Sequence, residues 1–553
     1  MHPLTLTRSI ALGLALLAGL AVGCSNGGPP TYEPPQSEPI PSSRPSQGSS
    51  ERPPMRGQGA DDEGASLFRR DPGGPNGLPP DTTFQHYGVN PTVDTEEERF
   101  SVFSIDSDTA SYTIARNYLL GGTLVPEAAV RVEEFVNAFD YDYAPPARGP
   151  FALHAEAFPS PSRPGYHVLH LALATRALDS RERRPANLVF VVDASGSMAD
   201  GNRIELVKHS LDVLLRSLGA QDRVGIVTFQ DTARLALPLT PGNQHDVILA
   251  AIDAIQPGGS TNAQAGIELG YGVLDQAFTP GMTHRVILCS DGVANSGLAT
   301  SAEGIFARVR ESAARGITLS SVGVGMANYN DVLLERLAQI GDGNYAYIDD
   351  EAEAEHLFSD RLAATLDVIA RDVKIQVEFD PKVVSRWRLL GYENRRLERE
   401  DFADDRVDAG EVGPGHAVTA LYEVKLRARA GSLGWFRVRY ESPDGGAAQQ
   451  LEQPLPTSIQ RASLAQASPA AQLAYVAAAF AEKLRGSYWA RKLGYEELLT
   501  WHAALPSPLR ERGEVRELGD LIAKSASLDR RGDKFAGLTE GDEIDWDRLP
   551  VLD

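Results

Sequence analysis

The sequence contains only two cysteines among its 553 residues, Cys24 and Cys289. Two cysteines cannot form a disulfide framework, so the folded parts must be held together by hydrophobic cores, which this length permits. The sequence also lacks any apolar run of the roughly 20 residues that a membrane-spanning helix requires. A disulfide-rich scaffold and a helical membrane-spanning protein are therefore excluded.

Positive charge is also scarce. Lys and Arg total 53 against 75 Asp and Glu, which gives a formal net charge of −22. So acidic a chain has no means of offsetting the repulsion of nucleic-acid phosphates. We therefore exclude nucleic acid as a partner.

The N-terminus has the pattern of an export signal. Arg8 precedes the apolar stretch IALGLALLAGLAVGC, which has signal-peptide length and ends in small residues before Cys24. This ending resembles the lipobox of bacterial lipoproteins, in which the cysteine becomes the first residue and carries acyl chains. Ala21 stands where the lipobox usually has Leu, and a plain secretory signal with an incidental cysteine is the alternative. The resemblance implies a signal peptide over 1–23 and a lipid on Cys24.

Residues 24–83 have a composition that cannot form a packed core. Residues 25–80 carry 13 of the 36 prolines and few aromatic or β-branched side chains. We predict a tether that holds the folded part away from the membrane. Ser25, directly after the cysteine, favours the outer membrane of the cell envelope if the organism is Gram-negative. With Cys24 lipidated, Cys289 is expected to be a small buried hydrophobic residue.

Residues 84–185 are predicted to form helices and then strands. Amphipathic helices are expected in DTASYTIARNYLLGG and PEAAVRVEEFVNAFDY, and strands in FALHAEAF and YHVLHLALA. Asp106 and Asp108 precede the first helix and are expected to cap it.

Residues 186–370 alternate strands with helices. The continuous apolar run LVFVVD predicts a strand covered on both faces, and RVGIVTF, RVILCSD, ITLSSVGVG and YAYID predict further short strands. Helical patterns lie between them, beginning with RIELVKHSLDVLLRSL. This order predicts a mostly parallel, doubly wound α/β domain.

Residues 371–553 change period and then return to helix. KIQVEFD, YEVKLRAR and WFRVRY alternate apolar and polar residues, as antiparallel strands with one solvated face do. ASPAAQLAYVAAAFAEKLRG and EVRELGDLIAKS have helical periodicity. Because strands are predicted on both sides of the α/β domain, we expect that domain to be inserted in, or flanked by, a β-sandwich, with helical N-terminal and C-terminal regions.

Five oxygen-bearing side chains are predicted to meet at one edge of the parallel sheet. Asp193 and Asp291 end two strands, and ligands of doubly wound sheets bind at such carboxyl ends. Ser195 and Ser197 follow the first strand, and Thr261 lies in the Gly-rich loop PGGSTNAQAG. We expect Asp193 at a solvent-facing strand end. A set of oxygens without sulfur or imidazole suits Mg²⁺ or Mn²⁺ rather than zinc.

These residues resemble a known site. The motif D-x-S-x-S, the Thr of GGST and the Asp of SDG match the metal-ion-dependent adhesion site (MIDAS) of von Willebrand factor type A domains, which are Rossmann-like. Stretches beginning FSVFSIDSDTASYTIARNYLLGG and VKIQVEFDPKVV resemble the N-terminal and C-terminal regions of a bacterial family of exported proteins with this domain. The resemblance implies that Ser195 and Ser197 bind the metal directly, that Thr261 joins in the ligand-bound state, and that Asp193 and Asp291 act mostly through water.

The resemblance therefore implies a membrane-anchored, metal-dependent protein-binding module, and no enzyme. Two carboxylates nearly neutralise a divalent ion, which leaves an open position for an Asp or Glu of a protein partner. A scaffold subunit of a cell-envelope complex is the alternative, and a metal-dependent hydrolase a further one. A phosphoryl-transfer enzyme of the haloacid dehalogenase type needs a second Asp where Ser195 stands, and neither a G-x-S-x-G elbow nor a Walker P-loop occurs.

Overall fold

The computed structural model describes residues 84–176, 183–292, 298–325, 331–355, 357–358, 368–407, 409–427, 431–443 and 445–536. The predicted signal peptide, Cys24 and the tether lie outside these residues, so the lipid anchor stays a prediction. Within the described ranges, no helix has both the length and the apolar character needed to cross a bilayer.

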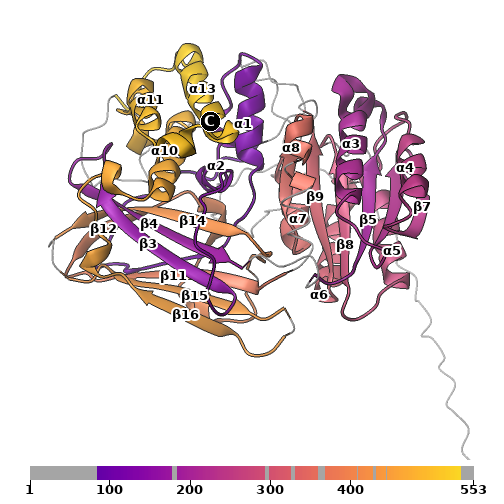
Figure 1. The fold of residues 1–553 in the computed structure, drawn as a ribbon, viewed down its shortest axis with the longest axis horizontal. Helices are drawn as coiled ribbons and strands as arrows, with labels where there is room; N and C mark the ends of the chain where they lie inside the picture. Colours follow the sequence, from indigo (N-terminus) through magenta and orange to yellow (C-terminus); the bar gives the residue numbers. More distant parts are fainter. Residues whose placement is uncertain are drawn as a thin grey trace, which may run out of the picture. The chain divides into compact units, whose positions relative to one another are not determined.

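A six-stranded sheet forms the α/β unit (Figure 1). Its order is β10-β9-β8-β5-β6-β7, and every neighbouring pair is parallel except β6 and β7. The strands are β5 (Ala186–Asp193), β6 (Arg223–Phe229), β7 (Ala233–Pro241), β8 (Thr283–Ser290), β9 (Ile317–Val324) and β10 (Tyr345–Ile348). The antiparallel edge strand β7 was not among the predicted strands.

Helices cover both faces of this sheet, as predicted for a doubly wound fold. Along β5, Phe190 lies in one hydrophobic cluster with α3 and α4, whereas Val189 and Val191 lie in another with α5, α6 and α7. This alternation explains the continuous apolar run, because both faces of the strand are buried. The helices are α3 (Arg203–Leu215), α4 (His245–Asp253), α5 (Ala263–Gln276), α6 (Leu298–Ala314), α7 (Asp331–Ile340) and α8 (Glu351–Glu355). Cys289 is buried in the first cluster, as expected.

Two five-stranded sheets form a β-sandwich, with orders β1-β12-β14-β4-β3 and β13-β2-β11-β15-β16. Strand β2 pairs with β11 in one sheet, and β4 pairs with β14 in the other, so each sheet combines strands from before and after the α/β unit. The α/β unit is therefore inserted in the sandwich, as expected. The strands are β1 (Val93–Asp94), β2 (Phe100–Ser104), β3 (Phe151–Pro159), β4 (Tyr166–Thr175), β11 (Arg371–Phe379), β12 (Val384–Leu390), β13 (Arg396–Leu397), β14 (Ala417–Leu426), β15 (Gly434–Glu441) and β16 (Gln449–Pro454).

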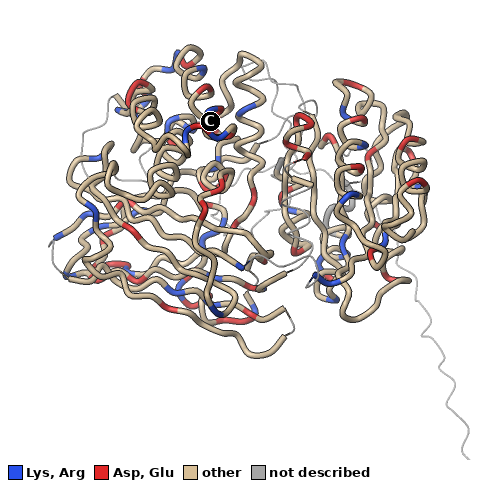
Figure 2. The backbone as a smooth tube through the Cα atoms, viewed as in Figure 1, with Lys and Arg blue, Asp and Glu red and all other residues tan. Residues whose placement is uncertain are grey.

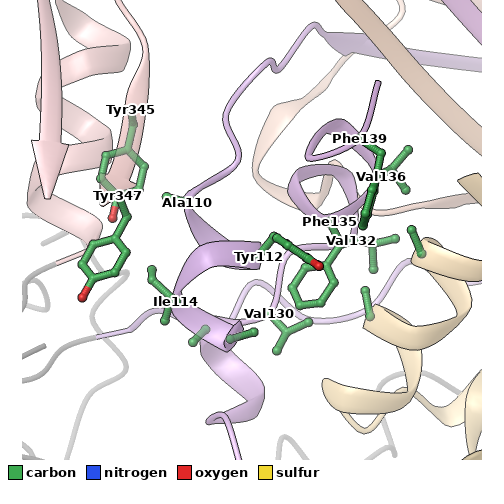
Figure 3. Close-up of a cluster of buried hydrophobic side chains, with 14 of the residues drawn as sticks. Ala110, Tyr112, Ile114, Val130, Val132, Phe135, Val136, Phe139, Tyr345 and Tyr347 are labelled. Atoms are coloured by element: carbon green, nitrogen blue, oxygen red, sulfur yellow. The ribbon is translucent and has the colours of Figure 1, made fainter. Parts of the chain in front are cut away.

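Flanking helices pack beside the sandwich and against the α/β unit. Tyr112 of α1 packs edge-on against Phe135 of α2, with ring centroids 5.4 Å apart. Figure 3 shows Ile114 of α1 on the side that faces Tyr347 of β10, and both belong to one hydrophobic cluster. The helices are α1 (Ala110–Leu120), α2 (Val132–Asn137), α10 (Pro469–Leu484), α11 (Tyr495–Ala503), α12 (Ser507–Arg510) and α13 (Gly513–Leu528).

Buried ion pairs also join the flanking helices to the α/β unit. Acidic and basic positions are spread along the chain (Figure 2), and several pairs bridge segments that are distant in sequence. Arg116 of α1 pairs with Asp349 directly after β10.

Asp106 and Asp108 accept hydrogen bonds from Arg395 at 3.0 and 3.3 Å, and α1 has no side-chain cap. The predicted capping role of these two aspartates is therefore wrong. One oxygen of each accepts from the distant guanidinium, and the other accepts from the backbone N–H of Asp108 or of Tyr345.

Candidate metal centre

The candidate site lies at the carboxyl ends of two adjacent parallel strands. Strand β5 ends at Asp193, and β8 ends one residue before Asp291. The strands are paired through Val192 and Cys289, so both carboxylates are placed at the same edge of the sheet. The edge is the one at which doubly wound proteins bind ligands.

Asp193 is fully buried, which corrects the expectation of a solvent-facing carboxylate. One oxygen, Oδ1, accepts a hydrogen bond from the Ser195 backbone N–H at 2.9 Å. The other, Oδ2, accepts one from the Ser290 hydroxyl at 2.7 Å. The neighbouring strand thus covers the end of β5. Burial raises the pKa of Asp193 to about 6; its hydrogen bonds from Ser195 act in the opposite direction, and the charge of Asp291 adds to the rise.

Two hydroxyls lie directly beyond this carboxylate. Ser195 Oγ and Ser197 Oγ are 3.0 Å apart. Ser195 is buried, and Ser197 lies in a short 3-10 segment over Gly196–Asn202. The alternation of D-x-S-x-S therefore turns its two side-chain oxygens toward each other at the mouth of the site.

Thr261 comes from a separate loop that is hydrogen-bonded to the first. The Gly258 backbone N–H donates to the Ala194 carbonyl at 2.8 Å, and the Gly196 N–H donates to the Gly259 carbonyl at 3.1 Å. Thr261 is buried, and Asn262 after it caps α5 by accepting from the Ala265 N–H. The two loops are thereby fixed side by side, with Thr261 placed at the start of a helix.

Gly259 illustrates how this loop is fitted to its surroundings. Its φ is +78°, and a Cβ there would lie 2.9 Å from an oxygen of Asp231. That carboxylate accepts from the backbone N–H and the hydroxyl of Ser260, at 3.1 and 2.5 Å. Asp231 follows β6 and supports the loop from outside, a role that the sequence analysis did not identify.

Asp291 is buried and only partly paired. Its Oδ2 accepts from Arg203 Nη1 at 3.0 Å. Its Oδ1 is buried and accepts no hydrogen bond of ordinary geometry from the described residues. Burial raises the pKa of Asp291, whereas the nearby Ser197 hydroxyl and the Arg203 guanidinium lower it.

These observations test whether the residues fit a divalent cation. A buried carboxylate oxygen without a partner is costly, and native structures seldom leave one without a water or an ion. Together with the hydroxyls of Ser195 and Ser197, this oxygen gives the site hard ligands of the kind that Mg²⁺ and Mn²⁺ prefer. The donor set fits a divalent metal.

A second acidic group lies on the sandwich. Asp372, Asp405 and Glu441 have oxygens within 4.8 Å of one another. Lys374 lies 3.1 Å from Asp372, and Arg439 lies 2.5 Å from Asp405, so basic residues already offset two of the charges. Exposed acidic groups of this kind are common without a metal.

The polar residues that support the five predicted ones were not predicted from the sequence. Ser290 and Arg203 contact Asp193 and Asp291 from other elements. Gln230 Nε2 donates to the Ala194 carbonyl at 2.8 Å. Ser290 could have been suspected because it precedes Asp291 at the end of a strand, but Arg203 resembles any cation at the start of a surface helix.

Three family models match the chain. The von Willebrand factor type A domain matches residues 187–360, which include all five predicted site residues. A von Willebrand factor model matches residues 79–170. The C-terminal model of the uncharacterized protein YfbK matches residues 364–432 and 425–528.

Similar proteins were found among curated sequences and solved structures. Uncharacterized protein YfbK of Escherichia coli (strain K12) is 36% identical over 450 residues, which are 76% of either chain. An uncharacterized protein of Synechocystis sp. is 26% identical over 307 residues, 53% of this chain and 70% of that protein. A von Willebrand factor type A structure from Catenulispora acidiphila is 16% identical and covers 68% of this chain and 89% of its own, with a TM-score of 0.41.

The matched domain gives a general function. Proteins with a von Willebrand factor type A domain are mostly interaction modules, and such domains often bind a divalent metal at the D-x-S-x-S site. This chain therefore carries a protein-interaction domain.

Proposed function

Because this chain belongs to the YfbK-like family of bacterial von Willebrand factor type A proteins, we propose that it is a lipid-anchored module that binds a protein partner through a divalent metal. The partner supplies an Asp or Glu carboxylate to the metal. The site that holds the ion consists of Asp193, Ser195, Ser197, Thr261 and Asp291.

One observation carries the proposal. Asp291 Oδ1 is buried and accepts no hydrogen bond of ordinary geometry from the described residues, and the Ser197 hydroxyl lies close enough to lower the pKa of this carboxylate. A cation held beside it would satisfy this unpaired oxygen through a water molecule bound to the ion. Ser195, Ser197 and Thr261 would hold Mg²⁺ or Mn²⁺ directly, and the two aspartates would act through water. The ion would supply an electrophilic position for an anionic ligand.

The local chemistry favours binding over catalysis. Both oxygens of Asp193 already accept hydrogen bonds, so this carboxylate is poorly placed to take a proton from a substrate. Cys289 lies two residues before Asp291, but burial raises the pKa of its thiol to about 12. A neutral, buried thiol is a poor nucleophile. We therefore propose that the site has no catalytic role.

The membrane part of the proposal depends on sequence alone. Cys24 would carry the lipid, residues 24–83 would form the tether, and the protein would lie in the cell envelope, in the outer membrane if the organism is Gram-negative. A tether of this length lets the module search for partners at a distance from the membrane.

A scaffold subunit of an envelope complex is the second candidate. Buried hydrogen bonds between the α/β unit and its flanks favour it, because they join the domain to other parts of the chain. Arg131 donates to Glu335 of α7 at 2.8 Å, and Asn394 donates to the same carboxylate at 2.8 Å. A scaffold of this kind would bind its neighbours with or without the metal.

Chelation separates the two candidates. Immobilised full-length chain would be exposed to solubilised envelope proteins of the producing cell, in Mg²⁺ or in a chelator. We expect a retained protein that the chelator elutes and that Thr261→Val no longer retains. Thr279→Val is the matched control, because the same change removes an exposed hydroxyl that bonds to the Ala277 carbonyl, before the start of β8 and outside the metal set. Retention that is equal in Mg²⁺ and chelator would favour the scaffold.

A further inference from the structure

Arg203 places a permanent positive charge beside the proposed metal. It is the first residue of α3, and its side chain is 9% exposed. Its Nη1 donates to Asp291 Oδ2 at 3.0 Å and to the Ser197 carbonyl at 2.6 Å. One guanidinium nitrogen thus contacts a side chain and a backbone group of two of the five site residues.

The fold makes room for this side chain at the end of β9. Gly325 follows that strand with a φ of +73°, and a Cβ at this position would lie 2.3 Å from Arg203 Nε and 2.6 Å from its Cδ. Any other residue would therefore strain the backbone and collide with the arginine. The path from α3 to Asp291 is open because the position is glycine.

Arg203 changes the charge of the site. Asp193 and Asp291 together contribute −2, and the guanidinium brings the buried groups to −1. With a divalent ion bound, their net charge is +1. Without the guanidinium, the two aspartates and the ion would have a net charge of zero. Asp200 also lies near Asp291 but is exposed, so solvent screens its charge.

We infer that Arg203 sets the ligand preference of the site, by weakening the hold on the metal and strengthening the attraction for an acidic partner. The inference rests on the proposed function. The guanidinium repels the incoming cation, and it leaves the loaded site with a net positive charge in a sheltered location. A carboxylate side chain of a protein partner neutralises that charge, whereas a neutral ligand gains nothing from it.

Arginine is suited to this role. Its guanidinium stays protonated, so the charge does not vary with pH in the physiological range. It also leaves Asp291 Oδ1 open, because it bonds to the other oxygen of the carboxylate. Arg203 therefore orients Asp291 toward the metal while it opposes the metal electrostatically.

The test compares the full-length wild type with Arg203→Met and Arg203→Lys. Methionine keeps an apolar stem without charge, and lysine keeps the charge. Mn²⁺ affinity would be measured by equilibrium titration, and acetate would serve as the carboxylate probe, followed by its displacement of Mn²⁺-bound water in proton relaxation. We expect Arg203→Met to bind Mn²⁺ about tenfold more tightly and acetate about tenfold more weakly, with Arg203→Lys close to wild type.

A purely structural role gives a different pattern. Losing the hydrogen bonds to Asp291 and Ser197 would lower both affinities together, and that outcome, or a lysine variant that behaves like the methionine variant, overturns the inference. The wild type offers a test that needs no variant, because acetate should tighten its Mn²⁺ binding by linkage. An Arg203→Met variant whose two affinities equal those of the wild type overturns the inference alone. Mn²⁺ affinity that acetate leaves unchanged also contradicts the carboxylate partner of the proposed function, and a wild type that binds no Mn²⁺ overturns the metal site itself.

Discussion

The Ser290 hydroxyl on β8 donates a hydrogen bond to the Asp193 carboxylate on β5, with 2.7 Å between the two oxygens. Ser290 in turn accepts from the Gly292 N–H at 3.2 Å. The bond ties together the ends of the two strands that carry the aspartates of the site. It also means that Asp193 is a structural residue as well as a candidate ligand.

Two substitutions of Asp193 should separate these roles. Asparagine can accept from the Ser195 N–H and donate to Ser290. The free energy of unfolding of Asp193→Asn should therefore lie within about 1 kcal/mol of the wild-type value, while its Mn²⁺ affinity falls at least about tenfold. Alanine leaves two buried donors unpaired and should also destabilise the fold by about 1–3 kcal/mol. Denaturant unfolding and Mn²⁺ titration of both variants check this. Wild-type affinity in Asp193→Asn would place the ion elsewhere.

Thr261 should matter more for the partner than for the metal. Its hydroxyl is expected to bind the metal only in the ligand-bound state. Removing it should therefore destabilise the ligand-bound state and leave the metal-loaded, ligand-free state largely unchanged. We expect Thr261→Val to weaken acetate binding to the Mn²⁺-loaded chain several-fold more than it weakens Mn²⁺ binding. Equal losses in both titrations would contradict this order of events.

Cys24 should decide where the protein is found. We expect Cys24→Ala to release the protein from the membrane fraction or to leave its precursor uncleaved, because the acyl chains have no other attachment point. Fractionation and the mass of the N-terminal peptide measure both outcomes. A variant that is processed normally and stays in the membrane fraction would disprove the lipid anchor.

A buried carboxylate in the flanking helices should control stability in acid. Glu482 of α10 accepts from Arg388 at 3.1 Å, from Ser487 at 2.7 Å and from Arg485. Burial opposes its ionisation, but the two arginines overcome that effect and lower its pKa from 4.5 to about 2. Because the folded pKa is the lower one, the carboxylate stabilises the fold fully above about pH 4.5, and that stability is lost as the pH falls toward 2.

Glu482→Gln tests that assignment. It removes one of the two carboxylates that each arginine contacts, because Arg388 keeps Glu423 and Arg485 keeps Glu393. The free energy of unfolding at pH 7 should therefore fall by about 1.5–3 kcal/mol, the contribution of hydrogen bonds to a charged group. The gap between wild type and variant should stay constant from pH 7 to pH 5 and narrow below pH 4.5. Denaturant titrations at several pH values measure it, and a gap that does not narrow below pH 4.5 would show that the pKa of Glu482 is not lowered.

Local sequence patterns predict much of the fold and most of the residues of the candidate site. The apolar run that ends at Asp193 identifies a buried parallel strand, and the order of strands and helices predicts which residues end at the same edge. The alternating strands on both sides of the α/β unit predict its insertion. Strands β1, β2, β7, β12, β13 and β16 were not predicted, and β1 and β13, with two residues each, are too short to show a hydrophobic period.

Long-range contacts account for what the sequence could not show. Arg203 meets Asp291 only after the chain has passed through three further strands, and no local sequence pattern near either residue indicates that contact. Asp193 looks exposed at a strand end, yet Ser290 from the neighbouring strand covers it. Asp106 and Asp108 look like helix caps in the sequence, yet their carboxylates accept hydrogen bonds from Arg395. Each error concerns a polar side chain whose partner is distant in sequence.

The position of the metal is the most direct test of the proposed function. Crystals of the full-length chain grown with Mn²⁺ would be measured at a wavelength where manganese scatters anomalously. We predict one anomalous peak within about 2.2 Å of Ser195 Oγ and Ser197 Oγ, on the side of Asp291 Oδ1. A map without a peak there at saturating Mn²⁺, or with its peak at Asp372, Asp405 and Glu441, would contradict the account.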